Sequence, residues 1–344
     1  MPNSKPSQSL KDHVNQNVKQ VVLGNLQFKA WFDSRYPEEL VRPGDGTLYV
    51  CRWCFRYTCD KQAYLGHTHA CESKDTPLGT QIYDHDGYSV WEVDGEDQKL
   101  FAQNLSLFAK LFLDHKSVFF DVSSFLYYLL VYTNPTNPND YYILGFFSKE
   151  KMSWDANNLA CILIFPPYQH KQLGKLLMGI SYKLSAWEWG DGVIGGPEKP
   201  LSEMGHRSYV RFWEERIARF LLHVNPSGAK EEQTNAKPQT GKKYKKKPPR
   251  EQMTIQDIGQ ATGMLVEDVL TALNSMGVVQ AEKKPAKRKR ASQPDDEEDL
   301  ATAVVKRSSV LEWSKTHNIN LRDPVREEGF LGEWAMGSEK EDSD

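Results

Sequence analysis

The segment from Asn157 to Lys175 constrains the fold of this chain more than any other stretch. Residues 159–165 form a short, almost unbroken apolar run that ends at Pro166-Pro167, which predicts a buried strand. A polar turn follows, and apolar residues then recur at helical spacing from Leu173 to Leu184. The sequence therefore predicts a strand, a loop and a helix. Such a loop presents backbone N–H groups and a helix N-terminus to a phosphate, although the pattern alone also fits a purely structural crossover.

Cysteine and histidine residues nearer the N-terminus have the spacing C-x2-C-x12-H-x3-C. Zinc prefers four nitrogen or sulfur ligands in a tetrahedron, and this spacing supplies two from a tight turn and two from one helical turn. The expected ligands are Cys51, Cys54, His67 and Cys71. His69 is an alternative ligand, but His67 shares a helix face with a residue four positions later. The helix of this finger carries little positive charge, which favours a structural role over DNA reading.

The whole chain has 344 residues, a net charge of −3 and five cysteines. This length fits one large domain with a small one, or two of ordinary size, and the charge excludes no class of partner. The cysteines do not form a disulfide framework, so we expect metal ligands in a reducing compartment. We also expect no membrane contact, because the sequence has no apolar run of about 18 residues and its first twenty residues lack a signal-peptide core.

Several motifs resemble the catalytic region of the MYST family of histone acetyltransferases. They are TPLGTQIY at 76–83, SVWEVDG at 89–95, GFFSKEK at 145–151, NLACIL at 158–163, PPYQ at 166–169, GKLL at 174–177 and GGPEKPLSEMG at 195–205. The resemblance implies an α+β fold of mixed α/β type, with a GNAT-like acetyltransferase core, an N-terminal C2HC zinc finger and a C-terminal helix-turn-helix-like segment. It favours the short, silencing-type members that lack a chromodomain.

The periodicity of the sequence agrees with such a core. Residues 21–40 suit a short hairpin, and the stripe Phe101, Leu105, Phe108 and Phe112 predicts a helix. Residues 118–122, 125–132 and 141–147 are predicted to form consecutive strands, the last two joined by the turn-rich residues 133–140. Together with the strand at 159–165, they predict a mixed sheet that begins as an antiparallel meander and has helices packed on it.

Three residues carry the chemistry that the resemblance implies. A lysine amine has a pKa of about 10.4, so a base must remove its proton before it attacks a thioester. Glu198, in a loop rich in glycine and proline, matches the family's general base. Cys161 matches a cysteine near the acetyl group, and either forms an acetyl-enzyme or only lines the pocket. Lys116 matches the lysine that the enzyme acetylates on itself; by sequence alone it would be a solvated charge after a helix.

The resemblance also implies the contacts for acetyl-CoA. They are Ile162, Leu163, Ile164, Gln169, His170, Lys171, Gln172, Leu173, Gly174, Lys175 and Ser202. The loop departs from the family signature at Gln172, which replaces a glycine, and at His170, which replaces an arginine. A glutamine at a position that needs φ > 0 costs roughly 1 kcal/mol or more, so we expect weakened cofactor binding.

The domain boundaries follow from changes in composition. We expect a disordered N-terminus at 1–20, an N-terminal region with the finger at 21–83, the catalytic core at 84–224, a basic flexible insertion at 225–252, a C-terminal helical segment at 253–336 with a charged insertion at 281–300, and an acidic tail at 337–344. Within the C-terminal segment, a capped helix starts at Thr254 and ends near Gly263, and a second helix covers 266–275.

Two functions therefore compete. The first is a nuclear lysine acetyltransferase that acts on histone tails and nucleosomes, with histone H4 as the expected substrate, in chromatin regulation or silencing. Such an enzyme would work with accessory subunits and contact nucleic acid non-specifically through its basic insertions. The second is a catalytically weakened zinc-finger scaffold that binds chromatin partners.

Overall fold

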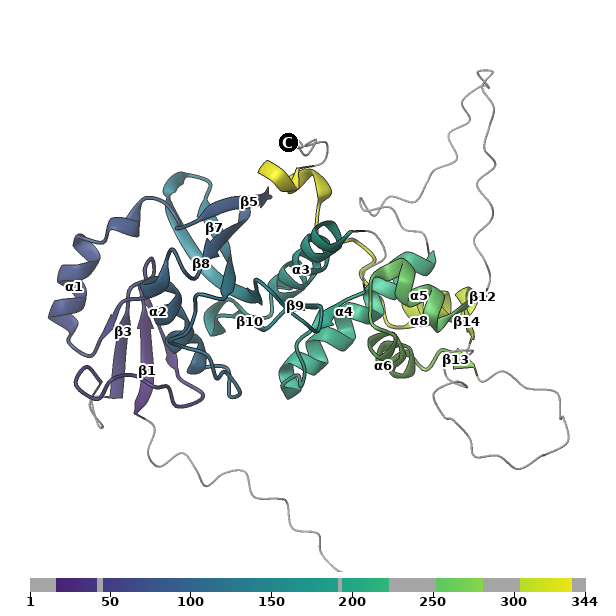
Figure 1. The fold of residues 1–344 in the computed structure, drawn as a ribbon, viewed down its shortest axis with the longest axis horizontal. Helices are drawn as coiled ribbons and strands as arrows, with labels where there is room; N and C mark the ends of the chain where they lie inside the picture. The colour runs from purple at the N-terminus through teal and green to yellow at the C-terminus, as the bar shows by residue number, and fades with distance from the viewer. Residues whose placement is uncertain (1–16, 42–45, 191–193, 223–251, 281–303, 336–344) are drawn as a thin grey trace, which may run out of the picture. The chain divides into compact units, whose positions relative to one another are not determined.

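The computed structural model describes residues 17–41, 46–190, 194–222, 252–280 and 304–335 (Figure 1). These residues form two compact units. One contains the described residues up to Met152, Ala160–Leu173 and those from Phe330 onwards; the other contains Ser153–Leu159 and Gly174–Gly329. The predicted N-terminal tail up to residue 16, nearly all of the basic insertion, the charged insertion and the acidic tail lie outside the described residues.

The N-terminal part of the first unit is a small sheet with strand order β2-β1-β3-β4. Its strands are β1 (Val18–Leu23), β2 (Leu26–Lys29), β3 (Gly46–Val50) and β4 (Tyr57–Thr58), followed by helix α1 (Lys61–His69). The pair β1–β2 is the predicted hairpin. Residues 18–20, which the sequence analysis placed in the N-terminal tail, belong to β1, where Val18 is buried against the core.

The central sheet of the same unit has the strand order β10-β8-β7-β6-β5 in the described residues. Its strands are β5 (Thr80–His85), β6 (Tyr88–Asp94), β7 (Phe125–Asn134), β8 (Asn137–Glu150) and β10 (Cys161–Ile164). Every neighbouring pair is antiparallel, so the meander predicted for residues 125–132 and 141–147 is confirmed, and the predicted mixed sheet is wrong for this layer. Strand β5 also runs across the boundary proposed between residues 83 and 84.

Two strand predictions need correction. Residues 118–122 form an irregular segment with a bend at 119–120 rather than a strand. Val122 is nevertheless fully buried, and its loop packs closely on Gly95, whereas Phe120 of the same segment is 56% exposed, so burial explains only part of the apolar pattern. The run 159–165 is not one strand either: β9 (Asn157–Leu159) ends before Ala160, and β10 begins after it. The chain changes partners there, since β9 pairs in parallel with β11 (Gly196–Pro197) whereas β10 pairs with β8.

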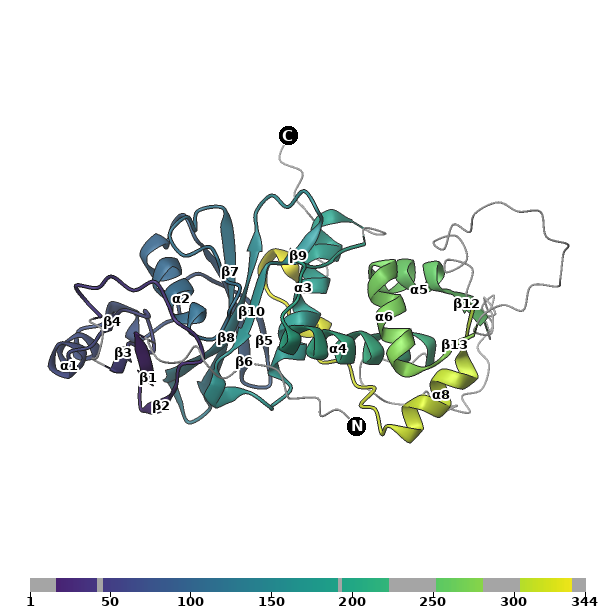
Figure 2. The ribbon, with the colours of Figure 1, turned by 90° about the horizontal axis from the view of Figure 1, so that it is seen from below.

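Helix α2 (Lys99–Lys110) lies between the N-terminal sheet and the central sheet (Figures 1 and 2). Its predicted apolar stripe is buried together with Tyr127, Leu129 and Val131 of β7. Because alternate residues of a strand face opposite sides, Tyr128 and Leu130 lie on the other face of the sheet, where they are also buried. Both faces of this sheet are therefore covered.

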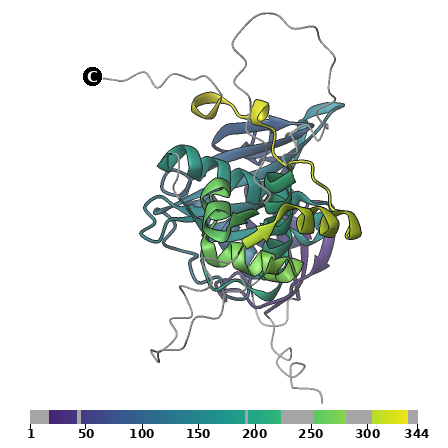
Figure 3. The same cartoon turned by 90° about the vertical axis from the view of Figure 1, so that its right-hand side faces the viewer.

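The second unit is largely helical. It contains most of α3 (Leu173–Trp189) and the whole of α4 (Glu203–Leu222), α5 (Ile255–Thr262), α6 (Val266–Met276) and α8 (Arg307–Thr316). Figure 3 shows α5 and α6 in green and α8 in yellow, toward the viewer. Thr254 and Asp257 form a capping box, and Gly263 and Gly277 end α5 and α6 with positive φ, as the sequence predicts. None of the described helices is both long and apolar enough to cross a membrane.

The helical pair is accompanied by a small sheet that the sequence did not predict. Its order is β12-β14-β13, from Gln252–Thr254, Val304–Lys306 and Val279–Gln280. The strands have two or three residues each, too short for an alternating pattern to be visible. Short 3-10 turns complete the described elements: η2 (Glu72–Lys74), η3 (Pro166–Tyr168), η4 (Glu327–Gly329) and η5 (Gly332–Trp334).

Candidate active site and metal centre

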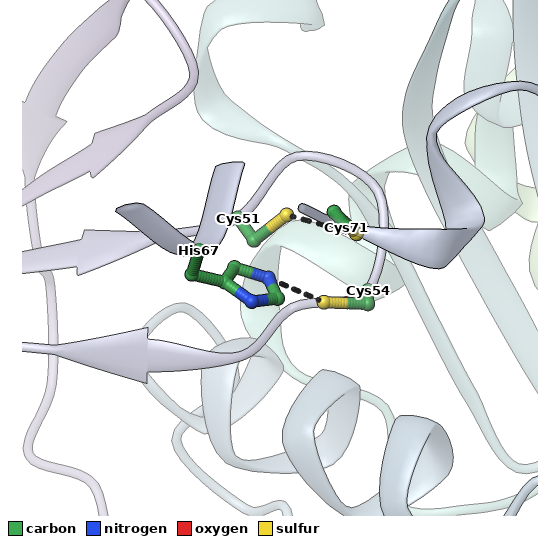
Figure 4. A group of neighbouring side chains, drawn as sticks. All are labelled: Cys51, Cys54, His67 and Cys71. Carbon is green, nitrogen blue, oxygen red and sulfur yellow. Dashed lines mark hydrogen bonds between the residues drawn. The ribbon is translucent and has the colours of Figure 1, made fainter. Parts of the chain in front are cut away.

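The four predicted metal ligands come together in the first unit (Figure 4). Cys51 and Cys54 lie on the turn after β3, His67 lies on α1, and Cys71 follows that helix. Asp60 caps the start of α1 by accepting hydrogen bonds from two backbone N–H groups, which fixes the helix that carries His67. His69 is not part of the cluster, so the choice of His67 over His69 is confirmed.

The spacing of the donor atoms fits a tetrahedral zinc ion. The Sγ atoms of Cys51 and Cys71 are 3.8 Å apart, Cys54 Sγ is 3.2 Å from His67 Nε2, and all four donor atoms lie within 4.8 Å of one another. A tetrahedron with zinc–sulfur bonds of about 2.3 Å has sulfur–sulfur edges of about 3.8 Å. The hydrogen bond between Cys54 and Cys51 lowers the pKa of Cys51 to about 5 and raises the pKa of Cys54, so the pair favours a thiolate at Cys51, the form that binds metal.

The zinc knuckle is anchored to the rest of its unit by Phe55 and Arg52. Phe55 is fully buried, and its ring centroid lies 5.7 Å from that of Phe101, 5.3 Å from Phe108 and 5.7 Å from Phe165. Arg52 pairs with Asp140 of β8 at 2.7 Å. The finger is therefore packed on α2 and on the residue that follows β10, which agrees with the predicted structural role.

Cys161 lies in a row of polar residues that the sequence analysis did not single out. It pairs with Ser148 of β8, which in turn pairs with Tyr127 of β7, so the three side chains share the sheet face that α2 covers. The hydroxyl of Tyr127 is 3.1 Å from that of Ser106 on α2. Burial raises the pKa of Tyr127 to about 12, which keeps the phenol protonated at neutral pH. Only strand register shows this row.

The predicted acetyl-CoA contacts on β10 divide between the two faces of the sheet. Leu163 lies on the same face as Cys161 and is buried in the core, whereas Ile162 and Ile164 lie on the opposite face and are half-buried. The Leu163 side chain is therefore occupied by packing. β10 is the edge strand of the described central sheet, and the N–H of Phe165 donates to the carbonyl of Leu144. By the alternation of an antiparallel pair, the backbone groups of Ile162 and Ile164, rather than those of Leu163, therefore face the open edge, where they suit a ligand.

The loop between β10 and α3 has an unusual backbone. The side-chain Nε2 of Gln169 donates to the carbonyl of Ile164 at 2.8 Å, which joins the start of the loop to the end of β10. Both His170 and Gln172 have φ of 63°, the left-handed region that glycine adopts most easily, and both side chains are exposed, like that of Lys171. The resemblance predicts a position that prefers glycine at Gln172, and the dihedral agrees with it. The second strained position, His170, was not anticipated.

Two residues predicted to contact acetyl-CoA have structural partners within the second unit. Lys175, in the first turn of α3, forms an ion pair of 2.7 Å with the buried Glu215 of α4. Ser202 Oγ accepts a hydrogen bond from the N–H of Gly205 at 3.1 Å and so caps the start of α4. Both contacts fix helices rather than point to a ligand. Leu173 is buried and Gly174 is half-buried in the first turn of α3.

Glu198 is exposed on the loop that follows β11. Its backbone N–H donates to the carbonyl of Leu159 at 2.9 Å, and Leu159 stands two positions before Cys161 in the chain. The main chain of the predicted base is thus attached to the segment that leads directly into the predicted pocket cysteine. Cys161 belongs to the first unit and Glu198 to the second.

Lys116 lies in the turn after α2 and is buried, with 7% of its surface exposed. The expectation from sequence alone, a solvated charge after a helix, is therefore wrong for its environment. A buried lysine is uncommon because burial disfavours the charged ammonium. Acetylation would remove that charge, but the acetylation of Lys116 stays a prediction.

Comparison with known proteins shows the family. The profile of the MOZ/SAS family matches residues 76–316. The chain belongs to this family. The MYST family zinc finger domain matches residues 15–71, which contain all four metal ligands. The described fold is therefore a mixed α/β MYST acetyltransferase domain preceded by a zinc finger.

Several curated proteins are similar to this MYST chain over 76% of its length. They include histone acetyltransferase MOF of Drosophila melanogaster at 37% identity, the Tip60 homolog of Caenorhabditis elegans at 37% and SAS2 of Saccharomyces cerevisiae at 35%. The matched region is 28% of MOF, 50% of the Tip60 homolog and 75% of SAS2. The chain thus spans half or less of the first two relatives and most of the third.

Proposed function

We propose that this chain is a lysine acetyltransferase that moves the acetyl group of acetyl-CoA to the ε-amine of a lysine in a histone tail. The observation that carries the proposal is Glu198, an exposed carboxylate whose backbone N–H is bonded to Leu159, two positions before Cys161. Its loop lies in a chain of the MOZ/SAS family, whose named relatives are histone acetyltransferases. Structural packing alone does not require an exposed carboxylate on such a loop.

Glu198 would act as the general base. It takes a proton from the lysine ammonium, and the neutral amine then attacks the thioester carbon. The new carbon–nitrogen bond forms as the carbon–sulfur bond breaks, and the leaving thiolate of coenzyme A takes up a proton. Cys161 would lie beside the acetyl group, with Ser148 and Tyr127 as the polar neighbours of its side chain on the sheet.

The segment from Ile162 to Lys175 would hold acetyl-CoA. The outer edge of β10 offers backbone groups to the amides of the pantetheine arm. The loop at 169–172 then brings backbone N–H groups and the N-terminus of α3 to the pyrophosphate, and Lys171 is exposed beside them. Ser202 remains a predicted contact. Zinc, held by the finger, would supply structural stability rather than chemistry.

The family also suggests the setting of the reaction. We propose a nuclear protein that acts on histones in chromatin, with nucleosomes and accessory subunits as partners and non-specific nucleic-acid contact through its basic segments. These basic segments lie outside the described residues. Lys116 would be acetylated by the enzyme itself, which mass spectrometry of the purified protein can test.

Transfer of radiolabelled acetyl from acetyl-CoA to histone-tail peptides tests the function directly. We expect transfer by the parent chain and a loss of about 10²-fold or more in Glu198→Gln, partly recovered at high pH, where more of the substrate amine is neutral. Glu203→Gln is the matched control, because Glu203 is an exposed carboxylate at the start of α4 that forms an ion pair with the exposed Arg207. Absence of transfer by the parent chain would support the scaffold function instead.

A further inference from the structure

We propose that Lys199 and Asp268 form a clamp that positions Glu198 for proton removal, so that both act on catalysis through the base rather than on the substrate. This inference rests on the proposed function. All the contacts that carry it lie within the second unit. Neither residue was singled out in the sequence, because they stand 69 positions apart.

The chain before Glu198 is held by backbone contacts. In the parallel pair β11–β9, Gly196 lies opposite Asn157 and Pro197 opposite Leu159. The N–H of Glu198 continues this pairing with its bond of 2.9 Å to the carbonyl of Leu159. Upstream of Glu198 the loop therefore has a fixed path.

The chain after Glu198 is held by a side chain instead. Lys199 Nζ lies 2.7 Å from Asp268 Oδ1 and also contacts Glu267 Oε1, both in the first turn of α6. The Asp268 side chain is 2% exposed, whereas Lys199 is 38% exposed. A buried, stationary carboxylate on a helix is a better anchor than a mobile surface group. Glu198 thus has tethers on both sides.

The anchor also fits closely against the loop. A Cβ atom on Gly196 would lie 2.8 Å from Asp268 Oδ2 and 2.9 Å from a methyl carbon of Leu265, which is too close for a side chain. Glycine at this position therefore allows the loop to approach α6. The contact places Asp268 against both ends of the Gly196–Lys199 segment.

The ion pair between Lys199 and Asp268 is better explained as a way to position the loop than as a source of folding stability. Burial raises the pKa of Asp268, and the bond from Lys199 lowers that pKa only in part. Burial also opposes the charge of Lys199, but its bonds to Asp268 and Glu267 raise its pKa overall. Ion pairs with an exposed partner contribute little to stability, and the Lys199 side chain is 38% exposed, so this pair is a poor source of stability. The ion pair does, however, fix the position of Lys199 relative to Asp268.

The test combines Lys199→Met with Glu198→Gln. Lys199→Met should lower kcat about tenfold with little change in the KM for acetyl-CoA, because a small displacement of the base is costly while cofactor contacts are untouched. In the Glu198→Gln background, the same change should cause no further loss, since there is no base left to position. Lys199→Arg, which retains the positive charge, should restore part of kcat.

Hydrogen exchange supplies a readout that does not depend on activity. The amide of Glu198 should exchange faster in Lys199→Met and in the isosteric Asp268→Asn, while Arg207→Met, which removes an exposed ion pair on α4, should change neither exchange nor kcat. Equal losses of kcat in the parent and Glu198→Gln backgrounds, or unchanged exchange in both clamp variants, would overturn the proposal. Full activity of Glu198→Gln would instead reject Glu198 as the base, while the exchange data still report on the clamp.

Discussion

The zinc finger and the loop between β10 and α3 are both short segments with recognisable sequence patterns, but they differ in how well residue type reports geometry. In the finger, the side chains themselves are the ligands, and spacing along the chain brings all four donor atoms within 4.8 Å. In the loop, the backbone conformation matters most, and two residues other than glycine adopt φ of 63°. A sequence motif therefore predicts the geometry of a site better when the side chains bind the ligand than when the backbone conformation does.

The largest expected effect comes from removing a metal ligand. Cys54→Ser should release about one zinc per chain and sharply reduce solubility and melting temperature, because metal binding and folding are coupled. Metal analysis and thermal unfolding measure both. Cys59→Ser is the matched control, since Cys59 lies outside the cluster and its loss should leave the zinc content unchanged. A parent protein without zinc would contradict the prediction.

A smaller effect should follow from loosening the contact that joins the two regions. Phe55→Leu removes ring contacts with Phe101, Phe108 and Phe165, and should lower the free energy of unfolding by about 1–3 kcal/mol while zinc stays bound. Denaturant unfolding with parallel zinc analysis provides the measurement. Phe120→Leu, at an exposed position, should have little effect. Equal losses from both variants would argue against the anchoring role of Phe55.

Relief of backbone strain in the loop should have a modest effect in the opposite direction. Gln172→Gly should stabilise the positive φ and tighten acetyl-CoA binding by roughly 1 kcal/mol, or about fivefold. Calorimetry on both proteins gives the sign. Gln172→Ala separates the causes, because it removes the side chain but retains the strain. Weaker binding by the glycine variant would show that the side chain, not the dihedral, determines affinity.

The smallest expected effect tests the limits of the zinc cluster. His69→Ala should leave zinc content and melting temperature unchanged, whereas His67→Ala should reduce both, because only His67 directs a nitrogen to the cluster. Metal analysis of the two variants decides between them. If His69→Ala also released zinc, the assignment of His67 as the histidine ligand from its helical spacing to Cys71 would be contradicted.

The sequence predicted much of the fold because many of its elements are specified by neighbours along the chain. The stripe from Phe101 to Phe112 repeats every three or four residues, and the capping box at Thr254 and the helix-ending Gly263 and Gly277 act within a single helical turn. The break at Ala160 was missed because the apolar run is continuous while the hydrogen-bond partners change. Residues 118–122 misled because apolar side chains also occur in loops: Val122 is buried without being in a strand, and Phe120 is exposed.

Residue type and local spacing by themselves determined the zinc ligands and the helix ends, whereas the expected base and pocket cysteine came only from the resemblance of the motifs to the MYST family. Tertiary structure alone decided the burial of Lys116, the row of Tyr127, Ser148 and Cys161, and the pairing of Lys199 with Asp268. The physical reason is distance along the chain. Helical periods, caps and knuckles depend on residues a few positions apart, whereas strand register and buried ion pairs join residues that only the folded chain brings into contact.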